Sequence, residues 1–208
     1  MFSIKTQALA KKYQRDWIFR GVDLDLSPND SVILLGGNGS GKSTLLQTLI
    51  GSITPSKGEI NYYHDEKVLD KEYWYKEVSI AAPYLDIYEE LTIHECIDNQ
   101  RSFKPFLNDL STQEIVGILE LDKAKKKHIY DYSSGMKQRL KLGLAILAKT
   151  KVLALDEPTM NLDKHAIQWF QSLVSQHLNN RIVITCSNEQ VAEYTHATKQ
   201  LNLMDFKP

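Results

Sequence analysis

An eight-residue glycine-rich segment that begins at Gly36 has the residue types and spacing of a phosphate-binding loop. It reads Gly-Gly-Asn-Gly-Ser-Gly-Lys-Ser and so completes the pattern G-x-x-x-x-G-K-S, with Lys42 and Ser43 at its end. Glycines let successive backbone N–H groups curl around a phosphate, and the N-terminus of a following helix adds partial positive charge. The spacing predicts that Lys42 reaches the β- and γ-phosphates of a nucleotide and that the Ser43 hydroxyl ligates Mg²⁺.

The segments on either side of this loop fit that chemistry. Ser31–Leu35 is a short apolar run that predicts a buried strand, and Thr44–Ile50 predicts the start of a helix. The order strand, glycine loop, helix is the context that the motif requires. We therefore expect the nucleotide to be bound by Gly36, Asn38, Gly39, Ser40, Gly41, Lys42, Ser43 and Thr44.

A second apolar run, Val152–Leu155, ends in two carboxylates, Asp156 and Glu157. Pro158 follows them and ends the strand, because proline has no N–H for the ladder. A carboxylate at the tip of a strand can hold Mg²⁺, directly or through water, which is the expected role of Asp156. Glu157 is expected to orient or deprotonate an attacking water molecule.

A third segment, Tyr132–Leu140, begins a further helix. Ser133 has the residue type of a helix N-cap, and the free N–H groups behind such a cap can attract an anion. Taken alone, this segment predicts no more than an ordinary helix start.

Together the three motifs resemble those of the ABC-type ATPases, whose signature is usually L-S-G-G-Q and is here closest to the S-x-G-M variant of exporters. The resemblance extends over essentially the whole chain. It implies that Tyr13 stacks on the adenine of ATP and that two cassettes meet head to tail, with Asn161–Asp163 at their contact. It further implies that Ser133 and Gly135 contact the γ-phosphate bound to the partner's Lys42.

Two residues that this family usually carries are absent. Pro83 stands where the family has a glutamine that contacts Mg²⁺, and Ser187 stands where it has a histidine that contacts the γ-phosphate; a second register places Cys186 there instead. The loss of one preorganised donor costs about 10²-fold or more in rate. Because Glu157 is retained, we expect a slow but competent ATPase in which Ser187 or Asn188 supplies a substitute hydrogen bond.

Composition argues against some partners. The chain has 208 residues and a formal net charge of −1, so no overall positive field attracts nucleic acid or anionic lipid. The basic run Lys123–His128 is expected to be a solvated face, with contact to lipid headgroups or nucleic acid as the alternative. The sequence contains no apolar run of 18 residues, so the chain is not expected to cross a membrane by itself.

The alternation of strands and helices after residue 30 predicts an α/β fold. We expect a P-loop NTPase core with a mainly parallel sheet, an N-terminal antiparallel β layer that precedes it, and a small helical insert. Residues 1–208 are expected to form a single ABC-type ATP-binding domain with a helical subdomain at approximately 84–140.

The resemblance implies an ATP-binding and ATP-hydrolysing subunit of a transporter, more specifically an exporter. It implies a homodimer or heterodimer, a separate transmembrane permease that docks near Tyr84–Tyr88, and a peripheral position on the cytoplasmic face of the cell membrane. One alternative is a module that closes on ATP and barely hydrolyses it. Another is a soluble ATPase acting on nucleic acid or the ribosome, which the near-neutral charge and the lack of a coiled-coil insert disfavour; no nucleic-acid partner is expected.

Overall fold

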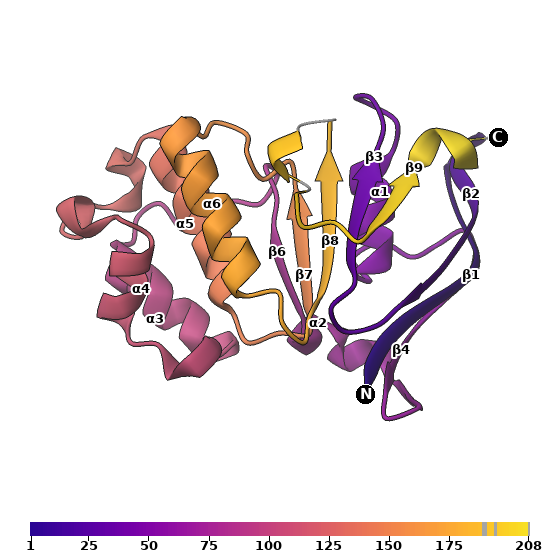
Figure 1. Ribbon diagram of the computed structural model, residues 1–208, viewed down its shortest axis with the longest axis horizontal. Coiled ribbons are helices and arrows are strands. Elements are labelled where there is room, and N and C mark those ends of the chain that lie inside the picture. Colours follow the sequence, from indigo (N-terminus) through magenta and orange to yellow (C-terminus); the bar gives the residue numbers. More distant parts are fainter. Residues whose placement is uncertain (189–190, 194, 208) are drawn as a thin grey trace.

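The computed structural model describes residues 1–188, 191–193 and 195–207, and it contains two β-sheets flanked by helices (Figure 1). An antiparallel sheet has the strand order β2-β1-β4-β5, and a parallel sheet has the order β6-β7-β8-β3-β9. The strands are β1 (Phe2–Tyr13), β2 (Asp16–Leu26), β3 (Ser31–Leu35), β4 (Lys57–His64), β5 (Lys67–Leu69), β6 (Val78–Ala81), β7 (Val152–Asp156), β8 (Ile182–Ser187) and β9 (Lys199–Asn202). The helices are α1 (Lys42–Leu49), α2 (Trp74–Glu77), α3 (Ile93–Phe103), α4 (Thr112–Ile118), α5 (Ser134–Leu147) and α6 (Lys164–Gln176).

The parallel sheet is covered on both faces. Successive side chains of a strand point to opposite faces of its sheet. In β7, Val152 and Ala154 join a core that includes α1 and the antiparallel sheet, whereas Leu153 and Leu155 join a core that includes α3, α5 and α6. Burial on both faces explains why this strand is apolar at every position before Asp156.

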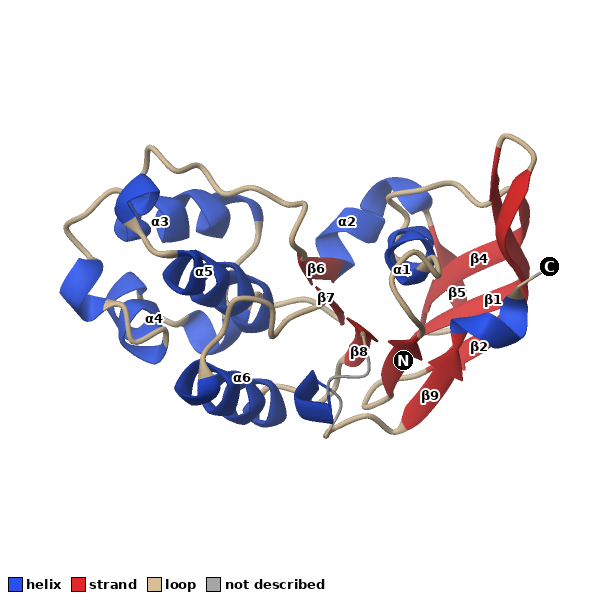
Figure 2. Ribbon diagram, turned by 90° about the horizontal axis from the view of Figure 1, so that it is seen from above, coloured by secondary structure: helices blue, strands red, loops and turns tan. Residues whose placement is uncertain are grey.

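Helix α1 is held between the two sheets (Figure 2). Its residues Leu45, Leu46 and Leu49 are fully buried in the core that the sheets share. The Tyr62 hydroxyl of β4 donates a hydrogen bond to the Leu49 carbonyl oxygen over 2.9 Å, and its ring stacks on Trp74 at 4.0 Å between centroids. The helix that follows the glycine loop is therefore fixed along its length.

A group of helices lies at the other end of the molecule from the antiparallel sheet (Figure 1). Helices α3 and α4 both begin with a capping box, Thr92 with Glu95 and Ser111 with Glu114, which satisfies two backbone N–H groups at each start. Their apolar faces share one core with α5 and α6. The central sheet thus stands between a β layer and a helical layer.

The expected mainly parallel sheet and antiparallel layer are confirmed, with one correction. The antiparallel layer was expected to precede the phosphate loop, but β4 and β5 follow it and β4 returns to pair with β1. Gly58 permits this return: it adopts φ 77°, and a Cβ there would lie 2.3 Å from the Ala8 carbonyl oxygen. Strands β6 and β9 have only four residues each, and the sequence did not indicate them.

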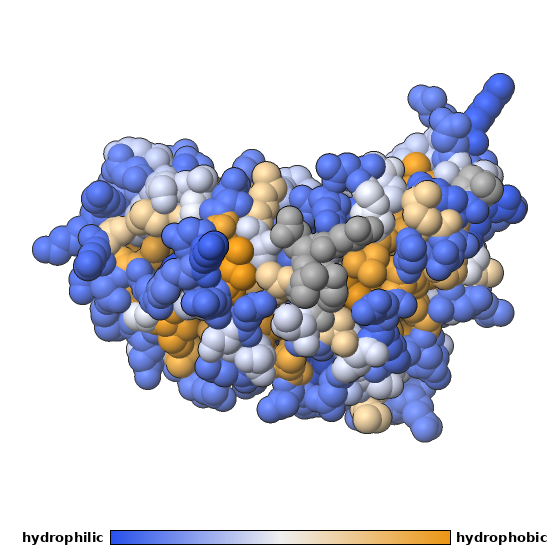
Figure 3. Space-filling view, turned by 45° about the horizontal axis from the view of Figure 1, so that its top comes forward, coloured by the Kyte–Doolittle hydropathy of each residue, from blue (hydrophilic) through white to orange (hydrophobic). Residues whose placement is uncertain are grey.

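Hydrophilic side chains cover most of the surface seen in Figure 3, and hydrophobic residues form smaller patches between them. Among the described residues, no helix combines the length and the apolar composition needed to cross a membrane.

Two glycines in neighbouring helices allow a test of this packing. A Cβ at Gly143 of α5 would lie 1.8 Å from Leu119 Cδ2, whereas a Cβ at Gly117 of α4 would meet nothing within 4 Å. We expect Gly143→Ala to lower the free energy of unfolding by about 1 kcal/mol or more through overpacking. We expect the control Gly117→Ala to raise it by about 0.5–1 kcal/mol, because alanine favours helix. Urea unfolding measures both, and equal effects would contradict the close packing of α5 on Leu119.

Candidate nucleotide site

The glycine loop connects β3 to α1 in the expected order. Gly41, the residue before the helix, adopts φ 101°, and a Cβ there would lie 2.2 Å from Ile18 Cγ2, so no other residue fits without displacing that side chain. Ser40 is 6% exposed, and its buried hydroxyl has no hydrogen-bond partner among the described residues. A buried polar atom without a partner is what a loop built to receive a ligand presents.

The Lys42 ammonium is buried at the start of α1 and is held by three oxygens. Its Nζ donates hydrogen bonds to the carbonyl oxygens of Gly36 at 2.7 Å and Gly37 at 3.1 Å, and to Asn188 Oδ1 at 2.5 Å. The loop itself therefore fixes the position of the cation. Asn38 and Gly39 are exposed at the tip of the loop, and Ser43 and Thr44 are half-buried in the first turn of the helix.

Asp156, at the end of β7, is only 2% exposed. Burial raises the pKa of its carboxyl group; a hydrogen bond with Ser43 opposes this, and the negative charge of Glu157 adds to it. The Asp156 Oδ1 atom has no hydrogen-bond partner among the described residues. A buried carboxylate oxygen beside a hydroxyl suits Mg²⁺, which usually takes one or two protein oxygens and completes its shell with phosphates and water.

Glu157 follows Asp156 in a backbone conformation that residues other than glycine rarely adopt, with φ 45°. Its N–H donates to the Cys186 carbonyl oxygen at 3.1 Å, and its Oε1 accepts a hydrogen bond from Asn188 Nδ2 at 2.6 Å. Such conformations persist where the surroundings hold them and are found disproportionately at functional sites. The carboxylate is therefore directed by contacts with β8 and the residue that follows it.

The two positions where family residues are missing lie at the end of β8 and in the loop directly before Tyr84. Ser187 is fully buried as the last residue of β8, where it pairs with Leu35, and the next residue, Asn188, reaches Lys42 and Glu157. Pro83 is followed by Tyr84, whose pKa is raised to about 12 by burial and by the negative charge of Asp156, against an opposing hydrogen bond with Gln47. Tyr84, from the segment where the glutamine was expected, therefore lies close enough to Asp156 to interact with its charge.

The loop after Glu157 is held by two side chains that the sequence did not single out. Gln138 Nε2 of α5 donates to the Pro158 carbonyl oxygen at 3.0 Å. Glu193 is 1% exposed, and its Oε1 accepts hydrogen bonds from Thr159 N–H at 3.0 Å and Thr159 Oγ1 at 2.6 Å. Gln138 lies within the Tyr132–Leu140 segment but was given no role of its own, and no motif marks Glu193.

The three residues assigned by resemblance lie away from this cluster in the sequence and on other elements. Tyr13 ends β1 with its side chain 47% exposed, and the Lys11 ammonium is 5.0 Å from its ring centroid. Ser133 is confirmed as the N-cap of α5, where it accepts a hydrogen bond from the Met136 N–H at 3.3 Å. Gly135 is half-buried, and a Cβ there would lie 3.2 Å from the Asn161 carbonyl oxygen.

Helices α1 and α5 pack on opposite sides of the parallel sheet (Figures 1 and 2). The fold therefore brings together Lys42, Asp156 and Glu157 but places Ser133 and Gly135 with a different layer of the molecule. The chain on its own presents two separate groups of candidate residues.

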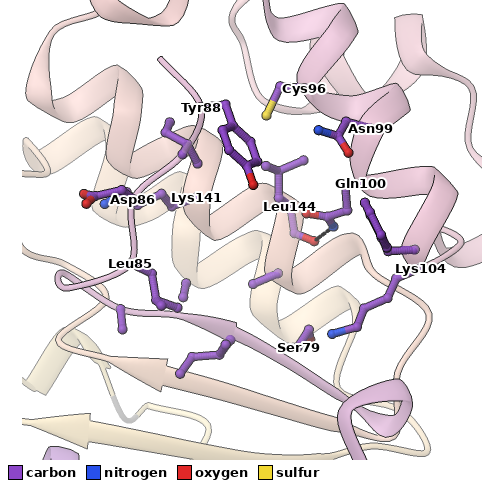
Figure 4. A pocket seen from close by; sticks show the side chains of 16 residues that line it. Ser79, Leu85, Asp86, Tyr88, Cys96, Asn99, Gln100, Lys104, Lys141 and Leu144 are labelled. Atoms are coloured by element: carbon purple, nitrogen blue, oxygen red, sulfur yellow. Dashed lines mark hydrogen bonds between the residues drawn. The ribbon is translucent and has the colours of Figure 1, made fainter. Parts of the chain in front are cut away.

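A groove of about 420 Å³ lies on the helical side, bordered by β6, the loop 82–88, α3 and α5 (Figure 4). Exposed apolar side chains surround it: Leu85 and Tyr88 from the loop and Phe103 from α3 are 37%, 69% and 78% exposed. Polar side chains lie on its wall, where Gln100 Nε2 donates to the Leu144 carbonyl oxygen at 2.7 Å and Lys104 Nζ donates to the Val78 carbonyl oxygen at 2.6 Å. Tyr88 therefore lines the groove, whereas Tyr84 approaches Asp156.

The fold and the glycine loop define a nucleotide-binding protein of the P-loop class. Comparison with known proteins identifies the family within that class. The family model described as "ABC transporter" matches residues 19–160. An ABC transporter ATP-binding protein of Bacillus subtilis, YcbN, is 30% identical over 83% of this chain and 56% of its own length. The bacitracin transport ATP-binding protein BcrA of Enterococcus faecalis is 25% identical over 99% of this chain and 71% of its own length. The chain belongs to the ABC transporter family and has the ATP-binding domain of that family.

The chain spans a little more than half of the first curated relatives that it matches, 56% of YcbN and 54% of YxlF, also from Bacillus subtilis. Solved structures share the fold. An ABC transporter ATP-binding protein from Pyrococcus furiosus has a TM-score of 0.81 at 21% identity, over 99% of this chain and all of that chain. A dimeric ATP-binding cassette in a post-hydrolysis state, bound to ADP and Pi, has a TM-score of 0.78 at 19% identity, over 98% of this chain and 94% of that chain.

The contact between Thr159 and Glu193 allows a test of how the loop after Glu157 is held. Thr159→Val removes the hydroxyl while keeping the shape, and it leaves a buried carboxylate oxygen with one donor fewer. We expect the free energy of unfolding to fall by about 1–3 kcal/mol, measured by urea unfolding. The control is Thr54→Val, at an exposed loop position. The same small effect in both variants would mean that the contact does not hold the loop.

Proposed function

We propose that this chain is the ATP-binding and ATP-hydrolysing subunit of a transporter, and that residues 1–208 act as one ATP-binding domain with a helical subdomain at approximately 84–140. The observation that carries the proposal is the meeting of Lys42, Asp156 and Glu157 at one edge of the parallel sheet, with Asp156 beside Ser43 and Asn188 bonded to both Lys42 and Glu157. A phosphate-binding cation, a metal-binding carboxylate and a second carboxylate for water activation are the groups that nucleotide hydrolysis requires.

Each residue has a proposed role. The backbone of Gly36–Gly41 and the Lys42 ammonium bind the phosphates of ATP, Ser43 and Asp156 hold Mg²⁺, and Tyr13 stacks on adenine. Bound Mg²⁺ supplies a positive charge that neutralises the phosphate oxygens. Glu157 orients and deprotonates the attacking water, and Ser187 or Asn188 supplies the hydrogen bond that the family's histidine usually gives.

We propose that hydrolysis requires two cassettes, as a homodimer or a heterodimer. Ser133 and Gly135 lie on the other side of the sheet from α1, so they are available to complete a site on a second copy. The proposal is supported by the dimeric arrangement of the solved cassette bound to ADP and Pi. Contact of Ser133 and Gly135 with the γ-phosphate would then make turnover depend on closure of the dimer.

The first test is Mg-ATP hydrolysis by the purified chain over a range of protein concentrations, beside Glu157→Gln and Lys42→Ala. We expect the rate to rise faster than linearly with concentration, because two copies form each site. We expect Glu157→Gln to lower the rate by about 10²-fold or more while ATP still binds, since a general base contributes that much. Binding of a fluorescent ATP analogue separates this loss from that of Lys42→Ala, which should also lose binding.

Other outcomes select the alternatives. Binding of ATP without hydrolysis above the Glu157→Gln level would favour an ATP-gated module, or a cassette that needs a different second cassette. Hydrolysis that DNA or ribosomes stimulate would favour a soluble ATPase acting on them. A rate that is linear in concentration and unaffected by Glu157→Gln would contradict the proposed mechanism.

We propose further that the groove beside α3 and α5 binds a helical segment of a separate transmembrane permease, which would hold the chain peripherally on the cytoplasmic face of the cell membrane. A partner helix can lay its apolar face into a hydrophobic groove. The exposed side chains of Tyr88 and Phe103 in this groove would contact that face. Relatives named for bacitracin transport and lantibiotic transport support a transport role, and the Ser133–Met136 signature variant favours an exporter.

A photoreactive amino acid placed at Tyr88 tests the groove directly. In the cells that normally produce the chain, we expect it to cross-link to an integral membrane protein. The control position is Val68 of β5, which is 61% exposed against 69% for Tyr88 but lies in the antiparallel sheet. Equal cross-linking at both positions, or cross-linking at Tyr88 to soluble proteins alone, would contradict docking at this groove.

A further inference from the structure

A basic segment between α4 and α5, residues 122–131, has no part in the proposed catalytic site. It carries four lysines against two aspartates, a net charge of +2 with histidine neutral, in a chain whose total is −1. Lys123, Lys126 and Lys127 are exposed, and Lys125 is half-buried. None of these ammonium groups forms an ion pair within the part of the chain that the structure describes. Their charge is therefore available to a partner.

The fold holds the backbone of the basic segment in place. Ala124 and Ile129 are buried in the core of the helical layer. The Ala124 carbonyl oxygen accepts hydrogen bonds from the Lys127 N–H at 2.9 Å and from the Tyr132 hydroxyl at 3.2 Å. Because the apolar residues are buried and the backbone is bonded, the lysines are presented on a surface that is already ordered. Binding of a partner then costs little backbone entropy.

The basic segment adjoins the loop that borders the proposed permease groove. The Tyr130 N–H donates to the Glu89 carbonyl oxygen at 2.9 Å. The Ile129 N–H donates to the Leu91 carbonyl oxygen at 2.8 Å. Glu89 directly follows Tyr88 of the groove, and both features belong to the end of the molecule that lies away from the antiparallel sheet (Figure 1). A permease bound at the groove would therefore bring the lysines close to the membrane that contains it.

Neighbouring acidic residues leave the lysines uncompensated. Glu89 and Glu120 each pair with a cation of α5. The exposed Glu90 lies beside His128, at the end of the segment that carries no lysine. Exposed charges farther apart than about 10 Å are largely screened at 0.1 M ionic strength. The lysines, and not the total charge of −1, therefore set the field that an anionic surface meets here.

We infer that the basic segment docks on the anionic headgroups of a lipid bilayer, as a second attachment beside the permease. Clusters of lysine next to a membrane attract anionic lipids, and stable anchoring to a membrane usually takes two signals. The inference goes beyond the proposed function. It rests on that function for one point, the permease groove that turns the segment toward the membrane.

The chemistry of the basic segment favours a headgroup layer over a polynucleotide. The segment contains no arginine, whose planar fork suits individual phosphates, and lysine supplies a point charge without that geometry. Tyr130 is 57% exposed, and its ring stacks on His128 at 5.4 Å between centroids. One face of the ring is therefore covered and closed to base stacking, by which single strands are bound. Tyrosine is also enriched where proteins meet the membrane interface.

Co-sedimentation of the full chain with vesicles is the direct test, with neither nucleotide nor permease present. Vesicles of phosphatidylcholine alone are compared with vesicles that also contain phosphatidylglycerol. We expect binding to the anionic vesicles alone. We expect it to weaken by about tenfold or more between 0.1 M and 1 M salt, because the screening length falls from about 10 Å to about 3 Å. Equal binding to both kinds of vesicle, or no binding to the anionic ones, would overturn the inference.

A triple variant identifies the lysines responsible: Lys123→Gln, Lys126→Gln and Lys127→Gln. Each lysine near an anionic surface strengthens binding about fivefold, so we expect this variant to bind the anionic vesicles about tenfold more weakly or worse. Arginine at the same three positions keeps the charge and should keep the binding. Wild-type binding by the glutamine variant would contradict a role for the segment.

The control removes the same charge from three exposed lysines on or near β5 and α2: Lys67, Lys71 and Lys76. We expect their replacement by glutamine to leave vesicle binding unchanged. An equal loss in both glutamine variants would mean that total charge alone sets the binding, and the inference would be wrong.

Competition tests the nucleic-acid alternative. Polyuridylate is added to the vesicle-bound chain at a phosphate concentration equal to that of the phosphatidylglycerol, and we expect most of the chain to stay on the vesicles. Its release would favour a polynucleotide partner and overturn the inference. Because this assay needs neither ATP nor a permease, it is independent of the proposed function. Vesicle binding that depends on the lysines, without cross-linking at Tyr88, would support the inference and reject only the proposed docking at the groove.

Discussion

The arrangement of the site depends on the parallel direction and the order of three strands. Because β7, β8 and β3 run the same way and lie side by side, the residues that follow them emerge at one edge of the sheet. Ligands in open α/β sheets bind outside the carboxyl ends of the strands. Here that edge collects Lys42 from the β3 side, Glu157 from β7 and Asn188 from β8.

Features that are contiguous in the sequence could be predicted from it. The glycine loop is a single local segment with an obligatory strand before it and helix after it, so its residues and the start of α1 were recognised directly. Asp156 was predicted at a strand tip because an unbroken apolar run precedes it. The structure shows that this run is apolar because the strand is buried on both faces. The N-cap at Ser133 was predicted from residue type and is confirmed. In each case the physical cause lies within about ten residues.

Contacts between distant segments could not be predicted in the same way. The sequence offered Ser187 and Asn188 as alternatives, and only the register of β8 shows which of them lies beyond the strand and reaches Lys42. Glu193 contacts the loop after Glu157 from a segment with no motif, and Gln138, although it lies in the Tyr132–Leu140 motif, reaches that loop only through the packing of α5. The groove is assembled from β6, α3 and α5, so its shape depends on tertiary packing.

The loop 82–88 has neighbours on two sides of the molecule. Tyr84 approaches Gln47 and Asp156, while Leu85 and Tyr88 border the groove, so the surroundings change between two neighbouring residues of the loop. If the groove binds a permease as proposed, the loop is under two selective pressures during evolution. Substitutions that adapt Tyr88 to a new partner must leave the backbone at Tyr84 in place. When such a chain acquires a new partner, the substitutions are then expected at the Tyr88 end of the loop. The Tyr84 end is constrained by its place beside Asp156.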